Sequence, residues 1–273
     1  MSKTHYYLLA SVLAIAPGVR AAQTTWQGDV FATDWSTPAN WSNGVPDSTT
    51  DVIIPDVPSG ILVIGSDTNA LSITVQPDAS PLSIMASSDA LNLYGDFTNS
   101  ATTGIDVSAD VNFKHSMTLN GQGAPITFRG VSSTVLNTVI IQGLINFGNT
   151  IVLGLDSAAA YGRFLVDSAA SLDLSGVTTI AFSASPYTGA NNNRFQLFDL
   201  TDGFWTGASV LSIDQNTLPT LTGGLAWDLT RFEIDGSISV VPGPSTITLL
   251  SIGAALASLV RRRNRRGTLP VAP

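Results

Sequence analysis

Many short segments of this 273-residue chain carry apolar residues at every second position. This is the period of a β-strand with one buried face, because successive side chains of a strand point to opposite sides. The clearest of these segments are 51–54, 71–75, 91–94, 111–113, 117–119, 126–128, 144–147 and 172–174. The glycines that separate them as turn formers include Gly121, Gly123, Gly130, Gly143 and Gly148. The pattern therefore predicts an all-β protein.

The sequence also has a longer repeat of about 20 residues, superimposed on this alternation. It is seen in three sets of apolar residues: Leu71, Leu91 and Val111; Ile73, Leu93 and Phe113; and Ile105, Ile126 and Ile145. Turns of a parallel β-helix would stack at such a period and bury a shared core. We therefore expect a right-handed parallel β-helix, or solenoid, over residues 61–240. A β-sandwich or jelly roll gives a similar strand spacing and is the alternative.

Residues 22–60 differ from this body because they hold three of the five tryptophans, Trp26, Trp35 and Trp41. The segment resembles the Trp-rich opening of autotransporter-like repeat proteins on bacterial surfaces, where it precedes stacked strands. The region from Tyr161 to Val240 is similar to the closing part of the same passenger-type proteins. We interpret the tryptophans as a cap over the open end of the solenoid. The alternative is a sugar-binding platform, since aromatic faces stack on pyranose rings.

The N-terminus has the pattern of a secretory signal peptide. Lys3 precedes an uncharged, largely apolar run from Tyr6 to Ala16, which Pro17 ends, and small residues follow. We expect a signal helix over residues 1–21, export through the Sec pathway and cleavage after Ala21. An N-terminal membrane anchor is the alternative, although the apolar run is short for one.

The C-terminus has three parts in a fixed order. The segment Val241-Pro242-Gly243-Pro244-Ser245-Thr246 comes first, and residues 247–260 follow without a charge. The third part is the basic cluster Arg261, Arg262, Arg263, Arg265 and Arg266. Counted from residue 242, the uncharged stretch is long enough for a transmembrane helix. The arginines and residues 267–273 should then stay in the cytoplasm. A plain membrane anchor is the alternative.

This order over residues 241–266 resembles the PEP-CTERM sorting signal of Gram-negative bacteria that make exopolysaccharide. The resemblance implies recognition and cleavage by an exosortase, a membrane-embedded transpeptidase-like enzyme. It also implies an intermediate anchored in the inner membrane, and then a place at the cell surface or in the extracellular matrix. The sorting motif would be Val241, Pro242, Gly243, Pro244 and Ser245, with Gly243 where the family usually has glutamate.

Charge divides the chain into an acidic body and basic ends. All 20 acidic residues lie between Asp29 and Asp235, together with only five of the 12 lysines and arginines. So acidic a surface should repel nucleic acid and is compatible with neutral sugars or divalent cations. The absence of cysteine excludes thiol catalysis and thiolate metal sites.

Catalytic residues are few. A Ser-His-Asp triad would depend on His115, the one histidine between the two ends, and no nucleophile-elbow glycines surround a serine. One histidine also cannot build a histidine-rich zinc site. The acidic pairs that could serve a glycosidase are Asp106 with Asp110, Asp167 with Asp173, and Asp199 with Asp202. Aspartate is equally common at turns. We therefore expect no catalytic, cofactor or metal site, with calcium bound by loop aspartates as the alternative.

These observations favour an exported protein with a structural or adhesive role at the surface or in the matrix. Its expected partners are an exosortase-like sorting peptidase, the inner membrane (transiently) and extracellular polysaccharide, with no nucleic acid. The alternative is a carbohydrate-binding or polysaccharide-degrading protein on the same β-helix.

Overall fold

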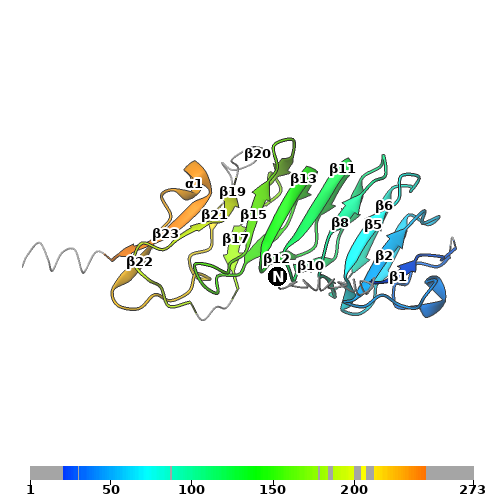
Figure 1. The fold of residues 1–273 in the computed structure, drawn as a ribbon, viewed down its shortest axis with the longest axis horizontal. Coiled ribbons are helices and arrows are strands. Elements are labelled where there is room, and N and C mark those ends of the chain that lie inside the picture. Colours follow the sequence, from blue (N-terminus) through cyan, green and yellow to red (C-terminus); the bar gives the residue numbers. More distant parts are fainter. Residues whose placement is uncertain are drawn as a thin grey trace, which may run out of the picture.

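A computed structural model of the chain describes residues 21–29, 31–86, 88–177, 179–183, 187–199, 204–206 and 212–243. The chain forms a β-solenoid whose successive turns lie side by side along the long axis of the molecule (Figure 1). The expected signal helix and the uncharged segment 247–260 fall outside the described ranges. Among the residues in those ranges, no helix has both the length and the apolar character needed to cross a membrane.

Each turn of the solenoid contributes one strand to each of three faces. The first face holds β1 (Ala22–Thr25), β2 (Thr50–Ile54), β5 (Ser72–Val75), β8 (Phe97–Asn99), the first part of β11 (Met117–Phe128) and of β13 (Thr138–Phe147), β15 (Arg163–Val166) and β19 (Phe198–Asp199). The second holds β3 (Ile61–Ile64), β6 (Leu82–Ala86), β9 (Ile105–Val107), the rest of β11 and β13, β16 (Ser171–Asp173) and β20 (Phe204–Thr206). The third holds β4 (Thr68–Ala70), β7 (Ala90–Leu93), β10 (Asp110–Phe113), β12 (Ser132–Val135), β14 (Thr150–Leu153), β17 (Thr179–Phe182) and β21 (Ser212–Ile213).

The strands of neighbouring turns pair in parallel, which confirms a solenoid over the β-sandwich alternative. The predicted repeat is correct in the middle of the chain. Leu91 pairs with Val111, and Ile126 pairs with both Ile105 and Ile145. It is wrong one turn earlier, where Leu91 pairs with Thr68 instead of stacking on Leu71. The number of residues in a turn varies along the chain. A repeat of constant length therefore does not identify the paired residues in every turn.

Gly121, Gly123 and Gly143 lie between two alternating segments, as predicted, but they do not end a strand. β11 and β13 continue through them around the corner from the first to the second face, where the pairing shifts register between Gly121 and Ile126. A Cβ on Gly121 would lie 2.4 Å from the carbonyl oxygen of Leu144. Glycine is needed at this corner because the backbones of adjacent turns approach closely.

Phenylalanines from all three faces fill the interior. Phe97 of the first face and Phe113 of the third each contact Phe128 of the second edge to face. Phe128 also stacks on its register partner Phe147, with ring centroids 4.9 Å apart. Full burial of each ring contributes about 1.5–3 kcal/mol to folding. The interior is therefore a continuous apolar column, as the period-2 pattern requires.

Aspartates tie successive turns together at the corners. Carboxylates accept hydrogen bonds from backbone N–H groups one turn ahead, at distances of 2.7–3.0 Å. The pairs are Asp56 with Ser80, Asp67 with Ala90, Asp96 with Thr118, and Asp110 with Ser132. These bonds satisfy donors that the bend in the chain would otherwise leave without a partner.

The two ends of the solenoid have different structures. At the N-terminal end, the three tryptophans follow β1 or flank η1 (Pro38–Asn40), are buried and contact one another, and Asp34 pairs in parallel with Val63 of β3. β1 and β2, which the sequence interpretation placed in the cap, are strands of the first face. At the other end, β18 (Arg194–Gln196), β23 (Ser237–Pro242) and β22 (Leu225–Asp228) form an antiparallel sheet beside α1 (Phe232–Asp235) (Figure 1). The parallel solenoid expected to residue 240 therefore gives way to a different element before that point.

Candidate functional site

A hollow lies at the corner between the third and first faces, where one turn is longer than its neighbours. Short turns connect β10 to β11 and β12 to β13, whereas residues 154–162 connect β14 to β15. This longer segment is a small loop closed by a bridge between Leu155 and Tyr161 and by a bond from Gly162 N–H to the Gly154 carbonyl. It overhangs the two preceding turns and encloses a volume of about 280 Å³.

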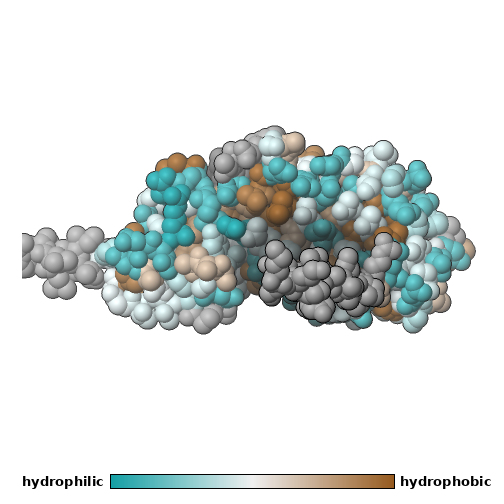
Figure 2. All heavy atoms as spheres, in the orientation of Figure 1, coloured by the Kyte–Doolittle hydropathy of each residue, from teal (hydrophilic) through white to brown (hydrophobic). Residues whose placement is uncertain are grey.

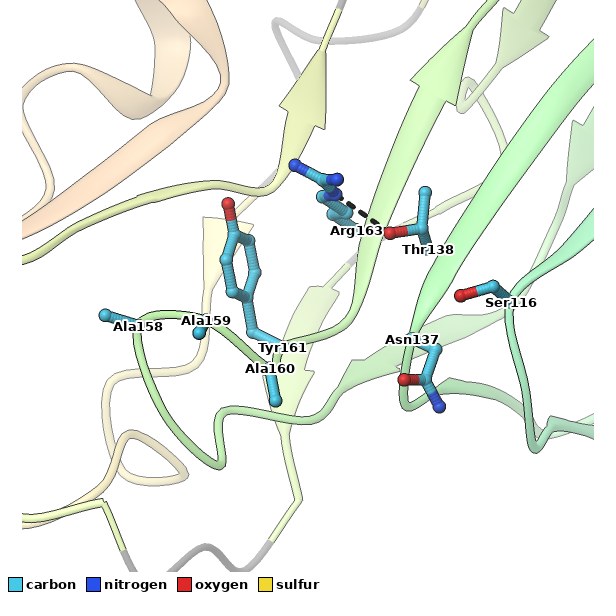
Figure 3. A pocket seen from close by; sticks show the side chains of 8 residues that line it. All are labelled: Ser116, Asn137, Thr138, Ala158, Ala159, Ala160, Tyr161 and Arg163. Carbon is cyan, nitrogen blue, oxygen red and sulfur yellow. Dashed lines mark hydrogen bonds between the residues drawn. The ribbon is translucent and has the colours of Figure 1, made fainter. Parts of the chain in front are cut away.

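The hollow has an apolar side and a polar side (Figure 3). Tyr161 and the three alanines 158–160 stand on the loop side. Ser116, Asn137 and Thr138, from the two preceding turns, face them. Ser116 is exposed and Asn137 and Thr138 are half-buried, so these three lie at the corner outside the core, whereas Tyr161 packs against the core.

Arg163 lies between the two sides. Its Nε donates a hydrogen bond of 2.9 Å to the Thr138 hydroxyl, and its guanidinium carbon sits 5.7 Å from the centre of the Tyr161 ring. Tyr161 is held in turn by an edge contact with Phe195 and by a bond from the Gln196 N–H to its hydroxyl. The guanidinium is therefore fixed in place by contacts on two sides.

Arg163 also differs from the other arginines of the body in its charge partners. Arg129 pairs with Asp106 at 2.8 Å, and Arg194 and Arg231 both pair with Asp235. Arg163 forms no ion pair with any carboxylate in the part of the chain that the structure describes. Its terminal N–H groups therefore have no carboxylate partner among the described residues and can bind a group from outside the protein.

The sequence interpretation did not find this hollow. The available signals were a break in the 20-residue repeat after Leu153 and an arginine within a strongly acidic region. Neither shows which turns the loop overhangs, since that depends on the register of the strands.

The predicted sorting motif lies only partly in the described ranges. Val241 and Pro242 belong to β23 and pair with Ala226 and Leu225 of β22, and Gly243 N–H donates to the Gly224 carbonyl at 2.7 Å. A Cβ on Gly243 would lie 2.8 Å from that same carbonyl oxygen. Pro244, Ser245 and the five arginines 261–263, 265 and 266 lie outside the described residues.

The structure places the two members of one acidic pair on different faces. Asp106 is on the second face and pairs with Arg129, whereas Asp110 is on the third face and bonds the Ser132 N–H. Among the described residues, no group of three or more histidine, aspartate or glutamate side chains is placed to hold a metal ion. Asp202 lies outside those residues. His115 packs its ring edge to face on Tyr94 at 5.4 Å and has no catalytic partner in the described chain.

The three tryptophans of the N-terminal segment are buried, with exposed fractions of 0–4%. Trp41 lies edge to face with both Trp26 and Trp35, at 5.0 and 4.8 Å, and its Nε1 donates to the Trp35 carbonyl. No indole face is left open for a sugar ring. This geometry opposes the platform interpretation and is the one that a cap requires.

Hydrogen bonds at turns shift several carboxylates. A backbone N–H from Ser36 lowers the pKa of Asp34, and one from Ser80 lowers the pKa of Asp56. The hydroxyl of Thr50 lowers the pKa of Asp47. At the other end, the Thr230 N–H lowers the pKa of Asp228, and the Ser237 hydroxyl lowers that of Asp235. In all five cases, hydrogen bonds at a turn stabilise the charged form of the carboxylate. The lowered pKa values therefore indicate structural roles and not a poised acid or base.

The outer surface is mostly polar, with small apolar patches. Figure 2 shows one such patch over β13 and β15, the strands that carry the exposed Leu144 and Leu165. Isolated apolar residues of this kind are normal on a folded protein.

Comparison of the chain with protein-family models, with curated proteins and with solved structures found no match in any of the three.

Proposed function

We propose that this chain is an exported protein of the cell surface or exopolysaccharide matrix of a Gram-negative bacterium, with a structural or adhesive role. The observation that carries the proposal is the order of parts at residues 241–266: a Pro-containing motif, an uncharged stretch and a cluster of five arginines. An exosortase-like peptidase would process this segment while the uncharged stretch is held in the inner membrane. Residues 1–21 would direct export through the Sec pathway.

The body supports a scaffold role. A solenoid presents long, regular faces, and its acidic surface favours solubility and repulsion between molecules. Both ends carry elements other than solenoid turns, which limits end-to-end association through open strands. We also propose that the solenoid is right-handed, that the signal peptide forms a helix and that residues 247–260 form a transmembrane helix.

The junction between body and tail suggests where processing occurs. β23 holds Val241 and Pro242 in the antiparallel sheet, and Gly243 still bonds to Gly224. A cut after Gly243 would leave β22 and β23 of this sheet whole in the mature protein. We therefore propose that the cut lies after Gly243 and leaves the folded body intact.

Mass spectrometry of the protein released from the cell surface tests the proposal. We expect a C-terminus at Gly243, with the arginine cluster absent. Replacement of Arg261, Arg262, Arg263, Arg265 and Arg266 by asparagine should leave the protein unprocessed in the membrane fraction, because the positive charges no longer fix the orientation of the tail. Mature surface protein that keeps the arginine cluster would contradict the proposal.

A carbohydrate-binding role is the second candidate, and the hollow beside Arg163 favours it over a degrading enzyme. Convergent polar groups beside an aromatic ring are typical of a ligand site. A glycan array and a reducing-sugar assay on the full-length protein separate the two. Binding without sugar release supports a lectin, whereas hydrolysis that is lost on an Asp→Asn substitution supports an enzyme.

A further inference from the structure

We propose that the hollow formed by Ser116, Asn137, Thr138, Ala159, Tyr161 and Arg163 binds a carboxylate-bearing sugar, that is, one hexuronic acid unit of an extracellular polysaccharide. This inference rests on the proposed matrix role of the chain, since it names the kind of ligand that the matrix would supply. Its first support is the unpaired charge of Arg163 described above.

The guanidinium selects a planar anion. With Nε committed to Thr138, two terminal nitrogens remain for a ligand. Guanidinium groups bind carboxylates through two parallel hydrogen bonds, which gives both strength and orientation. Because Thr138 and Tyr161 already hold the side chain, little conformational entropy is lost when the ligand binds.

The other polar groups suit a ligand with hydroxyls. The side-chain amide of Asn137 donates a hydrogen bond of 2.9 Å to the Lys114 carbonyl. The side-chain oxygen of Asn137 can therefore accept a bond from the ligand. Thr138 accepts a bond from Arg163, which leaves its own O–H free to donate. Ser116 adds an exposed hydroxyl. Donors and acceptors therefore lie within one hollow, beside the group that fixes the carboxylate.

The loop side adds apolar atoms beside which the C–H groups of a sugar can lie. It consists of Tyr161, whose ring Arg163 approaches at 5.7 Å, and the three alanines 158–160. The volume of about 280 Å³ is at the small end for ligand pockets, which run upward from roughly 300 Å³. One monosaccharide unit is the appropriate size.

The acidic surface restricts the polymer. A polysaccharide with a carboxylate on every sugar would be repelled by the 20 acidic residues of the body. A sparsely charged polymer, or the end of a chain, can place one carboxylate on Arg163 without bringing others against this surface.

Titration calorimetry of the full-length protein with three probes tests the proposal: glucuronic acid, glucose and acetate. We expect glucuronate to bind with a Kd of roughly 1 mM, a value typical of a ligand of this size. Glucose lacks the carboxylate and would lose the bonds to the charged guanidinium, whereas acetate lacks the hydroxyls and would lose the bonds to Asn137, Thr138 and Ser116. Each should therefore bind at least about tenfold more weakly.

The variant Arg163→Gln should weaken glucuronate binding about tenfold or more, because it removes both terminal donors. Arg129→Gln is the matched control, since that arginine is on another face, and binding should not change. Thr138→Val removes the bond that holds the guanidinium but keeps the charge, so binding should fall less than in Arg163→Gln. Thermal unfolding of each variant shows whether it folds like the wild type.

Three results would overturn the proposal. Acetate binding as tight as glucuronate binding would reduce the hollow to a general anion site. Equal binding of glucose and glucuronate would show that the carboxylate is not recognised. Unchanged binding in a folded Arg163→Gln protein would show that Arg163 does not bind it. Each leaves the sorting proposal untouched, because the C-terminus of the surface protein is measured separately.

Discussion

The two ends of the solenoid are covered by different means. At the N-terminal end, large indole rings are buried and pack together, with Trp35 fully buried and Trp41 in contact with both Trp35 and Trp26. The C-terminal end is covered by backbone pairing, where β23 lies between β18 and β22. Its tryptophan, Trp227, is only partly buried. Side-chain packing protects one end and hydrogen-bonded strands protect the other, so the two should respond differently to mutation.

The largest expected effect is at the tryptophan cap. Trp35→Ala should lower the free energy of unfolding by about 3–5 kcal/mol, because it leaves a large cavity over the first turn. Trp227→Ala should lower it by about 1–3 kcal/mol, since that ring is partly exposed and loses one hydrogen bond to the Pro219 carbonyl. Urea denaturation measures both.

Trp35→Phe is the matched control for the cap. Trp35→Phe should lower the free energy of unfolding less than Trp35→Ala, because an aromatic ring remains in the site. The Nε1 that is removed has no hydrogen-bond partner among the described residues. Equal losses in Trp35→Ala and Trp227→Ala would show that the two ends do not differ in the way proposed.

A smaller effect is expected at Gly243. Gly243→Glu introduces the residue that the sorting family usually has, but its Cβ would meet the Gly224 carbonyl at 2.8 Å. The end of β23 should separate from β22, with a loss of about 1–3 kcal/mol. Hydrogen exchange of Leu225 to Asp228 should accelerate, while exchange in the N-terminal cap stays the same.

Gly65→Glu is the control for this substitution, since a Cβ at Gly65 meets nothing within 4 Å. It should leave exchange in β22 unchanged. Slow, wild-type exchange in Gly243→Glu would mean that the backbone contact does not determine the residue at this position.

At neutral pH, we expect the carboxylates at turns to make the smallest of these contributions to folding stability. Hydrogen bonding holds the pKa of Asp56 below its ordinary value of 3.8, so this group stabilises the fold above pH 3.8. The contribution is lost as pH falls through the lower pKa of the folded state. Asp34, Asp47, Asp228 and Asp235 have the same sign, so both ends should loosen together in acid.

Thermal unfolding between about pH 5 and pH 2 measures this dependence. Asp56→Asn should flatten the profile, since the carboxylate that accepts the Ser80 N–H is lost. Asp78→Asn should not, because its carboxylate has no hydrogen-bond partner in the described chain. A profile that is equally steep in wild type and Asp56→Asn would contradict the assignment.

Much of the fold could be predicted from local patterns. Alternation in segments such as 111–113 and 126–128 correctly placed the inward side chains of β10 and β11, because the two-residue period of a strand is local. The antiparallel sheet at residues 194–242 was missed, since alternation is the same in parallel and antiparallel strands. The hollow was missed for a related reason: Arg163 and Ser116 are brought together by turns of unequal length.

The sequence alone determined that the body is all-β, which residues face its core and that its charge is acidic. It also supplied the C-terminal pattern on which the sorting proposal rests. Only the tertiary structure decided the register of the turns, the antiparallel closure beyond Arg194 and the position of Arg163, which has no ion pair among the described residues. The physical reason is that a strand's alternation is encoded within a few residues. Which strands become neighbours depends instead on how the inner side chains pack and how long each corner is.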